Sequence, residues 1–153
     1  MRPSAIARSK QKERVLRDLV HGLVRGGAAT ESARDVIMQI RAGLPIAELN
    51  ALQASMDLPL EDLALKLGIS KATLHRRKVA GRLAPEESDR VVRFARLMGR
   101  AMEVFGNEMD AKKWLGAAQY GLGGAVPLDY AETEVGAREV ENLLGRIEHG
   151  VYS

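Results

Sequence analysis

The chain has 153 residues, of which 46% are apolar and 28% are charged, and it contains no cysteine. This length and apolar content suit one domain, or two small helical units that share a core. The lack of cysteine excludes disulfides and thiolate metal sites and permits a reducing compartment. No apolar run approaches the roughly 18 residues of a membrane span, and residues 1–4 lack the apolar block of a secretory signal, so we expect a soluble cytoplasmic protein.

The net charge of +3 hides an uneven distribution along the chain. Residues 1–27 hold 7 basic and 2 acidic side chains, and residues 70–100 hold 9 and 3. Residues 28–69 hold 3 basic and 6 acidic side chains, and residues 101–153 hold 4 and 9. Such asymmetry is expected when one part of a chain meets phosphates and another part meets a different partner. The alternative is that these are ordinary solvated faces.

Helical periodicity, capping residues and prolines account for the elements of the chain, and no convincing β-type alternation appears. A first helix is expected over about residues 9–25, with a buried stripe that includes Val15, Leu19 and Leu23. It could be a dimerisation arm, a DNA-contacting arm or an ordinary amphipathic packing helix. Later helices are marked by N-capping residues, or by prolines that can begin a helix, at Thr30 or Ser32, Pro45, Pro59, Ser70, Pro85 and Thr133.

A compact helix-turn-helix pattern occupies residues 59–78. Small Ala64 lets a second helix approach closely, and Gly68 gives the backbone the freedom for a sharp turn, which Ile69 anchors in the core. Ser70 is the expected N-cap of the second helix. The core side of that helix is expected to be formed by Ala72 or Thr73, Leu74 and Val79. The alternative is a plain helical hairpin with a basic end.

In a helix-turn-helix motif the second helix enters the major groove, where its N-terminal residues face base edges and flanking basic residues hold phosphate. The side chains expected to contact bases are Lys71, Thr73, His75 and Arg76. Those expected to contact the DNA backbone are Ser70, Arg77, Lys78 and Arg82. Because a single half-site contact is weak, we also expect a symmetric dimer and a palindromic operator.

A long helix is expected over about residues 85–105, apolar around much of its girth and therefore central to the fold. Four arginines recur along it every three or four residues: Arg90, Arg93, Arg96 and Arg100. They could extend the DNA-binding surface, pair with acidic groups, or simply be solvated.

Shorter elements are expected in the C-terminal third. A helix over about residues 108–117 carries Trp114, which is either a core residue or a contact for a partner. The run Gly121-Leu122-Gly123-Gly124 indicates a tight turn rather than a phosphate loop, because no strand precedes it and no Lys-Ser/Thr pair follows. Pro127 can begin a short turn, and Thr133 is the N-cap of a last helix that Gly150 can end.

Nothing in the sequence indicates an enzyme. The three histidines, His21, His75 and His149, are scattered, and no His, Asp or Glu cluster has metal-ligand spacing. Acidic pairs such as Glu61-Asp62 suit the starts of helices better than acid–base catalysis. We therefore expect no catalytic residue, no metal and no cofactor.

A series of motifs runs along the chain in an order and spacing typical of one family. They are Gly68-Ile69-Ser70, Thr73-Leu74, Arg76-Arg77, Arg82-Leu83, Glu87-Ser88-Asp89-Arg90, residues 101–106, Trp114-Leu115, Leu122-Gly123-Gly124, Pro127-Leu128, Thr133, Gly136, residues 140–144, Ile147 and Gly150. Through them, residues 43–153 resemble the Xre-type antitoxins with an Xre/MbcA/ParS toxin-binding C-terminal domain, which are partners of RES-domain toxins.

The resemblance implies a bacterial type II antitoxin that binds its toxin through the C-terminal domain and represses its own operon through the helix-turn-helix. It also implies that the toxin degrades NAD, and that residues 145–153 cover the entrance to its active site. The candidate toxin contacts are Tyr120, Leu122, Asp129, Tyr130, Arg138, Glu141, Arg146, Glu148, His149, Val151 and Tyr152. The alternative function is a stand-alone helix-turn-helix regulator or adaptor whose C-terminal domain only dimerises.

The expected fold is all-α, with a helix-turn-helix DNA-binding unit followed by a small helical toxin-binding domain. We expect a basic N-terminal helical arm over residues 1–43, which could dimerise, a DNA-binding domain over 44–100 and a toxin-binding domain over 101–153. The expected partners are a RES-domain toxin, operator DNA and a second copy of the chain.

Overall fold

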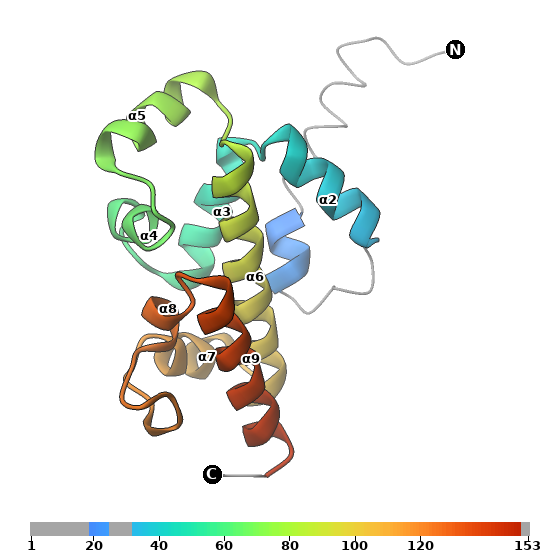
Figure 1. Cartoon of the computed structure of the whole chain (residues 1–153), viewed down its shortest axis with the longest axis vertical. Coiled ribbons are helices and arrows are strands. Elements are labelled where there is room, and N and C mark those ends of the chain that lie inside the picture. The colour runs from blue at the N-terminus through green and yellow to red at the C-terminus, as the bar shows by residue number, and fades with distance from the viewer. Residues whose placement is uncertain (1–18, 25–31, 151–153) are drawn as a thin grey trace.

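The computed structural model describes residues 19–24 and 32–150, and over these ranges it consists of helices and connecting turns without a strand (Figure 1). The all-α expectation is therefore confirmed. A helical segment at residues 19–24 precedes the remaining elements. These are α2 (Ala33–Ala42), α3 (Ile46–Met56), α4 (Leu60–Lys66), α5 (Lys71–Ala80), α6 (Pro85–Phe105), α7 (Glu108–Leu115), the 3-10 turn η1 (Tyr120–Leu122), α8 (Pro127–Tyr130) and α9 (Glu134–Glu148). None of the described helices has the length and apolar character needed to cross a membrane.

The helix starts follow from local chemistry. The hydroxyls of Ser32, Ser70 and Thr133 accept hydrogen bonds from backbone N–H groups three residues on, as expected of N-caps. Pro85 occupies the first turn of α6, where its missing N–H costs nothing. Pro45 and Pro59 differ slightly from expectation, because each is the N-cap and the helix begins one residue later.

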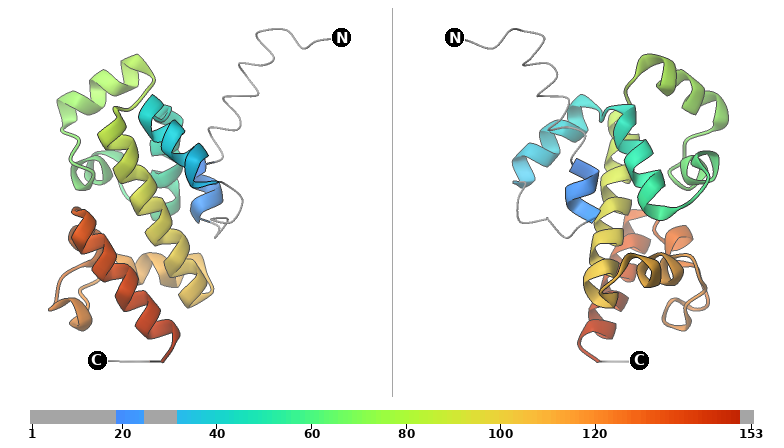
Figure 2. Two further views of the ribbon diagram at one scale, coloured as in Figure 1. Left: turned by 45° about the vertical axis from the view of Figure 1, so that its right-hand side comes forward. Right: turned by 180° about the vertical axis from the view of Figure 1, so that it is seen from behind.

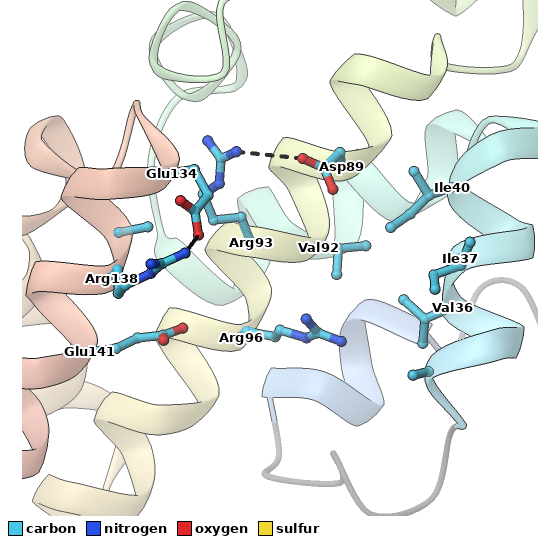
Figure 3. A pocket seen from close by; sticks show the side chains of 12 residues that line it. Val36, Ile37, Ile40, Asp89, Val92, Arg93, Arg96, Glu134, Arg138 and Glu141 are labelled. Carbon is cyan, nitrogen blue, oxygen red and sulfur yellow. Dashed lines mark hydrogen bonds and ion pairs between the residues drawn. The ribbon is translucent and has the colours of Figure 1, made fainter.

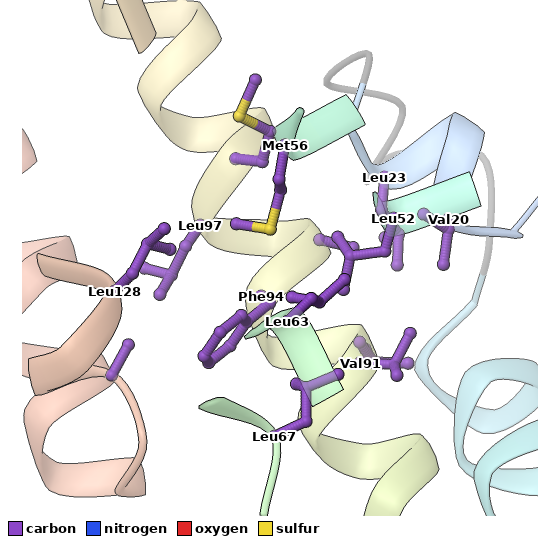
Figure 4. Close-up of a cluster of buried hydrophobic side chains, with 14 of the residues drawn as sticks. Val20, Leu23, Leu52, Met56, Leu63, Leu67, Val91, Phe94, Leu97 and Leu128 are labelled. Carbon is purple, nitrogen blue, oxygen red and sulfur yellow. The ribbon is translucent and has the colours of Figure 1, made fainter. Parts of the chain in front are cut away.

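Helix α6 is the central support of the molecule. In both views of Figure 2 it runs through the middle, with α2 to α5 around its N-terminal half and α7 to α9 around its C-terminal half. Phe94, Leu97 and Met98 are fully buried along it. Figure 4 shows Leu63 of α4 beside Phe94, and Leu128 of α8 facing Leu97. The helix-turn-helix and the C-terminal elements thus share one continuous core, and the boundary expected at residue 100 falls inside α6.

The described part of the N-terminal arm packs against the rest of the chain. Leu19, Val20 and Leu23 are buried, and the Val20 N–H donates to a carboxylate oxygen of buried Glu48 at 2.8 Å. Gly99 of α6 permits this approach, because a Cβ there would lie 2.1 Å from the Leu23 carbonyl oxygen. Residues 19–24 therefore behave as an amphipathic packing helix. The other expectations for the arm, over residues 1–18 and 25–31, lie outside the described residues.

One residue that the sequence pattern predicts to lie in the core is exposed instead. Val79 of α5 is 78% exposed, so its predicted burial is wrong. The reason is that α5 packs on the molecule by one narrow face, on which Leu74 is the buried residue. Most of the helix surface is left open.

Candidate DNA-binding and toxin-binding surfaces

Helices α4 and α5 form the expected helix-turn-helix. Gly68 adopts φ +73°, a left-handed conformation that favours glycine, and reverses the chain after α4. Ile69 is buried, and its N–H donates to the Ala64 carbonyl oxygen at 2.8 Å, which holds the turn against α4. Ser70 then caps α5. The turn therefore fixes where α5 begins.

The first two turns of α5 present polar side chains to the surface. Thr73 is half-buried, whereas Ser70, Lys71, His75, Arg76 and Lys78 are exposed. The Arg76 Nη2 donates to Thr73 Oγ1 at 3.0 Å, and the Ser70 hydroxyl donates to the same oxygen at 3.0 Å. Lys71 lies 4.0 Å from Glu61, with both side chains largely exposed, which makes a weak pair. These six DNA-contact candidates are open to a ligand, and α5 lies at the edge of the molecule (Figure 1).

Two other DNA-contact candidates, Arg77 and Arg82, form hydrogen bonds to other parts of the chain. The Arg77 guanidinium donates to both oxygens of Glu87, at 2.7 and 3.3 Å. The Arg82 guanidinium donates to the Gly43 carbonyl oxygen. The sequence names Glu87 only as part of a family motif and does not predict that it pairs with Arg77. The spacing of ten residues across a turn carries no local signal for it.

Three arginines of α6 form hydrogen bonds to different neighbouring elements. Arg90 donates to the Leu67 carbonyl oxygen at 3.1 Å, and Arg93 donates to the Glu132 carbonyl oxygen at 3.2 Å. Arg100 donates to both oxygens of Glu148, at 2.6 and 3.2 Å. These three side chains tie α6 to the helix-turn-helix, to the corner before α9 and to the end of α9. Of the three alternatives for the stripe, pairing with acidic groups applies to Arg93 and Arg100, which form ion pairs with Asp89 and Glu148. Arg90 donates to a backbone carbonyl instead, and Arg96 is exposed.

The glycine-rich run forms the expected tight turn. The Gln119 N–H donates to Ala125 O at 3.0 Å, and the Gly124 N–H donates to Gln119 O at 2.9 Å, which closes the loop. Tyr120 is 91% exposed at its tip. Leu122, in contrast, is buried in the core, so this candidate toxin contact supports the loop from beneath. A rigid loop with an exposed aromatic ring is suited to binding a protein partner.

The candidates on α8 lie where the C-terminal elements meet the helix-turn-helix. The Asp129 carboxylate forms an ion pair with the Lys66 ammonium of α4. Tyr130, next to it, is partly exposed. Asp129 thus has a structural partner of its own.

The candidates on α9 are spread along the helix. Arg138 pairs with Glu134 one turn before it, at 2.8 Å, and Glu141 is exposed. Glu148 is held by Arg100, whose hydrogen bonds lower the pKa of the Glu148 carboxyl below its ordinary value. His149 is exposed just after the helix. Arg146 is half-buried, and its Nε has no hydrogen-bond partner among the described residues. Val151 and Tyr152 lie outside the described residues.

A groove of about 420 Å³ lies between α2 and α9 across α6 (Figure 3). Val36, Ile37 and Val92 give it an apolar side, and Arg138 and Glu141 are the candidate toxin contacts that reach it. The candidates thus lie on η1, α8 and several turns of α9. Among residues 19–24 and 32–150, no group of three or more His, Asp or Glu side chains could hold a metal ion.

Comparisons with known proteins match two parts of the chain to family models. Residues 35–96 match the model of the antitoxin Xre-like helix-turn-helix domain, and residues 100–150 match the antitoxin Xre/MbcA/ParS C-terminal toxin-binding domain. A protein named Antitoxin Xre from Yersinia enterocolitica is 36% identical over 120 residues, which is 77% of this chain and 81% of that protein. Another of the same name from Photorhabdus laumondii is 34% identical over 116 residues, 74% of this chain and 78% of the relative. A third, from Pseudomonas putida, is 35% identical over 68 residues, 44% and 43% of the two chains.

Proposed function

This chain belongs to the antitoxin Xre family, and on that premise we propose that it neutralises a RES-family toxin that degrades NAD. In this proposal the C-terminal elements bind the toxin, and the end of α9 with the residues after it covers the toxin's active site. The chain binds operator DNA through helix α5, as a homodimer on a palindromic site. It thereby represses the operon that encodes the toxin and the antitoxin. The chain itself acts as a regulator and inhibitor rather than as an enzyme.

The observation that carries the proposal is the division of the surface between two matched domains. The helix-turn-helix match contains α5, whose exposed polar face includes Lys71, His75 and Arg76. The toxin-binding match begins at residue 100, and residues 101–153 carry 9 acidic against 4 basic side chains. An acidic surface repels DNA phosphates, so this part of the chain is suited to a protein partner.

For DNA binding, the open side chains of α5 are the contacts we propose. Exposed Arg76 is hydrogen-bonded to half-buried Thr73 in the first two turns of the helix, where a major-groove helix meets base edges. A bidentate contact from Arg76 to guanine would contribute about 1–3 kcal/mol of discrimination. Lys71 and Lys78 are suited to phosphate, which contributes affinity without sequence preference.

For toxin binding, we propose that Tyr120 and Tyr130 are aromatic contacts and that residues 145–153 obstruct the active site. Tyr120 supports this role because its loop is closed by backbone hydrogen bonds, so little conformational entropy is lost on binding. Arg146 and His149, at the end of α9, belong to this obstructing segment.

The test is coexpression with a RES-domain protein encoded beside the gene, followed by purification, mass measurement and an assay of NAD consumption. We expect a stable complex that consumes no NAD. Deleting residues 150–153 should release NAD consumption while leaving the fold and DNA binding intact, because these residues follow the end of α9. Full inhibition by that truncated chain would contradict the obstruction of the active site.

A matched variant separates the two activities. Replacing Arg76 with alanine should abolish preference for operator DNA and leave toxin inhibition unchanged, because Arg76 is exposed and its hydrogen bond to Thr73 stays within its own helix. Arg76 is a better choice than Arg77, whose replacement would also disturb Glu87. If no toxin copurifies and DNA binding persists, the chain is a stand-alone regulator.

A further inference from the structure

We infer that the ion pair of Arg77 with Glu87 sets the orientation of α5 for DNA binding, so that Arg77 is a positioning residue and not a phosphate contact. This inference rests on the DNA-binding part of the proposed function. It assigns to Glu87, an acidic residue that cannot attract DNA, a role in DNA recognition.

Helix α5 needs such a restraint because its own packing is slight. Leu74 is its buried residue, and its other side chains are exposed or half-exposed. The turn at Gly68 and Ile69 holds its N-terminal end against α4. Its C-terminal end is tied by backbone, through the Ile46 N–H that donates to Gly81 O, so a side-chain attachment is what would further limit tilting of α5 and rotation about its axis. The register of the side chains that must meet base edges depends on both.

The Arg77–Glu87 pair supplies this side-chain attachment, near the C-terminal end of α5. Two hydrogen bonds join the guanidinium to the two oxygens of the carboxylate, and such a bidentate pair restricts direction as well as distance. The Glu87 side chain is 9% exposed and the Arg77 side chain 30%. The pair is therefore better shielded from solvent than the exposed Lys71–Glu61 pair of the same helix-turn-helix.

Glu87 is itself firmly held. Its Oε1 also accepts a hydrogen bond from the Ala84 N–H at 2.8 Å, at the start of α6. The next residue, Ser88, donates to Ala84 O and accepts from the Leu44 N–H, both at 2.8 Å. The backbone of Gly81 and Leu83 is bonded in turn to the start of α3, by the Ile46 N–H to Gly81 O at 3.0 Å and the Leu83 N–H to Leu44 O at 2.8 Å. Arg77 thus attaches α5 to a corner that several hydrogen bonds hold in place.

Binding of Arg77 to phosphate would break this arrangement. Burial raises the pKa of Glu87, but the hydrogen bonds from Arg77 and from the Ala84 N–H outweigh it and leave the pKa below its ordinary value. Removing Arg77 would leave a largely buried carboxylate without its guanidinium, which is unfavourable. Glu87 would also repel the phosphate that Arg77 was meant to contact. The geometry therefore favours an Arg77 that stays paired with Glu87 over one that also binds DNA phosphate.

Two conservative variants of the full chain distinguish positioning from phosphate contact. Arg77→Lys keeps the charge but loses the planar fork, and Glu87→Gln removes a negative charge near DNA. The probes are a DNA fragment from upstream of the gene and a scrambled fragment of the same length, in a series of salt concentrations. Arg76→Ala is the comparison, as an exposed neighbour whose hydrogen bond, among the described residues, goes to Thr73 of α5.

If the pair positions α5, both variants should bind the upstream fragment at least about tenfold more weakly, with little change for the scrambled fragment. The double variant should bind the upstream fragment no more weakly than the single variant of lower affinity, because the effects of replacing two residues that act together do not add. If Arg77 contacts phosphate, Arg77→Lys should stay within about twofold of the wild type and Glu87→Gln should bind both fragments more tightly. That second pattern would overturn the inference.

Hydrogen exchange of the backbone amides gives a readout that does not depend on DNA. Glu87→Gln should speed exchange in the C-terminal half of α5 while leaving α4 and α9 unchanged. Unchanged exchange in α5 would also overturn the inference. If the wild type does not prefer the upstream fragment, the DNA-binding function itself fails, and the exchange result still decides whether the pair holds α5.

Discussion

At the scale of single residues, the same substitution at two glycines of one helix can have opposite effects on stability. Helix α9 contains Gly136 and Gly145. A Cβ on Gly136 would lie 1.6 Å from the Tyr130 carbonyl oxygen, whereas a Cβ on Gly145 would meet nothing within 4 Å. Glycine inside a helix is ordinarily destabilising relative to alanine at either position. The structure shows that the first permits a close approach of α8 and that the second only costs helix stability.

Substitution by alanine should therefore act in opposite directions at these two positions. Gly145→Ala should raise the free energy of unfolding by about 0.5–1 kcal/mol, the ordinary gain of alanine over glycine in a helix. Gly136→Ala should lower it by more than this amount, because α8 and α9 must separate. Urea unfolding of both variants checks the signs, and each serves as the other's control. A stabilised Gly136→Ala protein would contradict the close packing of α8 on α9.

The Arg77–Glu87 pair predicts how stability depends on pH. Because the folded pKa of Glu87 lies below the ordinary value of 4.5, the ionised carboxylate stabilises the folded state above that pH. The contribution is lost as pH falls through the folded pKa. The stability difference between wild type and Glu87→Gln should therefore be largest near neutral pH and shrink below about pH 4.5. Urea unfolding at several pH values measures it, and a difference that grows in acid would contradict the assignment.

At the scale of elements, the ends of helices are held by side chains from other helices. Arg100 of α6 bonds both oxygens of Glu148 and one oxygen of Glu103, which fixes the last turn of α9. Arg138 makes a contrasting pair, with Glu134 of its own helix. The first ties two elements together, and the second lies entirely on one exposed surface.

Replacing Arg100 with glutamine should loosen the last turn of α9, because only the first pair joins it to α6. Amide exchange at residues 147–150 should become several-fold faster, with little change in the midpoint of unfolding. Arg138→Gln is the matched control and should leave this exchange unchanged. Equal effects of the two variants would show that the tie to α6 is not what holds the end of α9.

What the sequence predicts well are features determined by a few neighbouring residues. Ser70 and Thr133 cap helices as expected, since an N-cap depends only on the residue and the next turn. The sequence does not predict that Arg77 pairs with Glu87, or that Arg100 pairs with Glu148. Any of several arginines and carboxylates could pair, and only the packing of the helices chooses among them. The predicted burial of Val79 is wrong for the same reason, because the exposure of a side chain depends on what its helix packs against.

At the scale of the whole molecule, α6 joins the two functions. Its N-terminal half supports the helix-turn-helix through Phe94, and its C-terminal half carries α7 and α9. Lys66 of α4 and Asp129 of α8 add a direct ion pair between the two parts. The matched domains meet near residue 100, in the middle of this helix. The chain thus has two functional surfaces on one core.

A shared core should unfold as one cooperative unit. The single tryptophan, Trp114, lies in the C-terminal part, with its ring centroid 5.6 Å from that of Phe105, so its fluorescence reports on that part. Far-ultraviolet circular dichroism reports on all helices. The two transitions in urea should coincide. Leu128→Ala, which truncates a buried contact of α8, should lower the free energy of unfolding by about 2–5 kcal/mol and shift both transitions equally. If it shifted the tryptophan signal alone, the C-terminal elements would be an independent domain, and toxin binding could not influence α5 through the core.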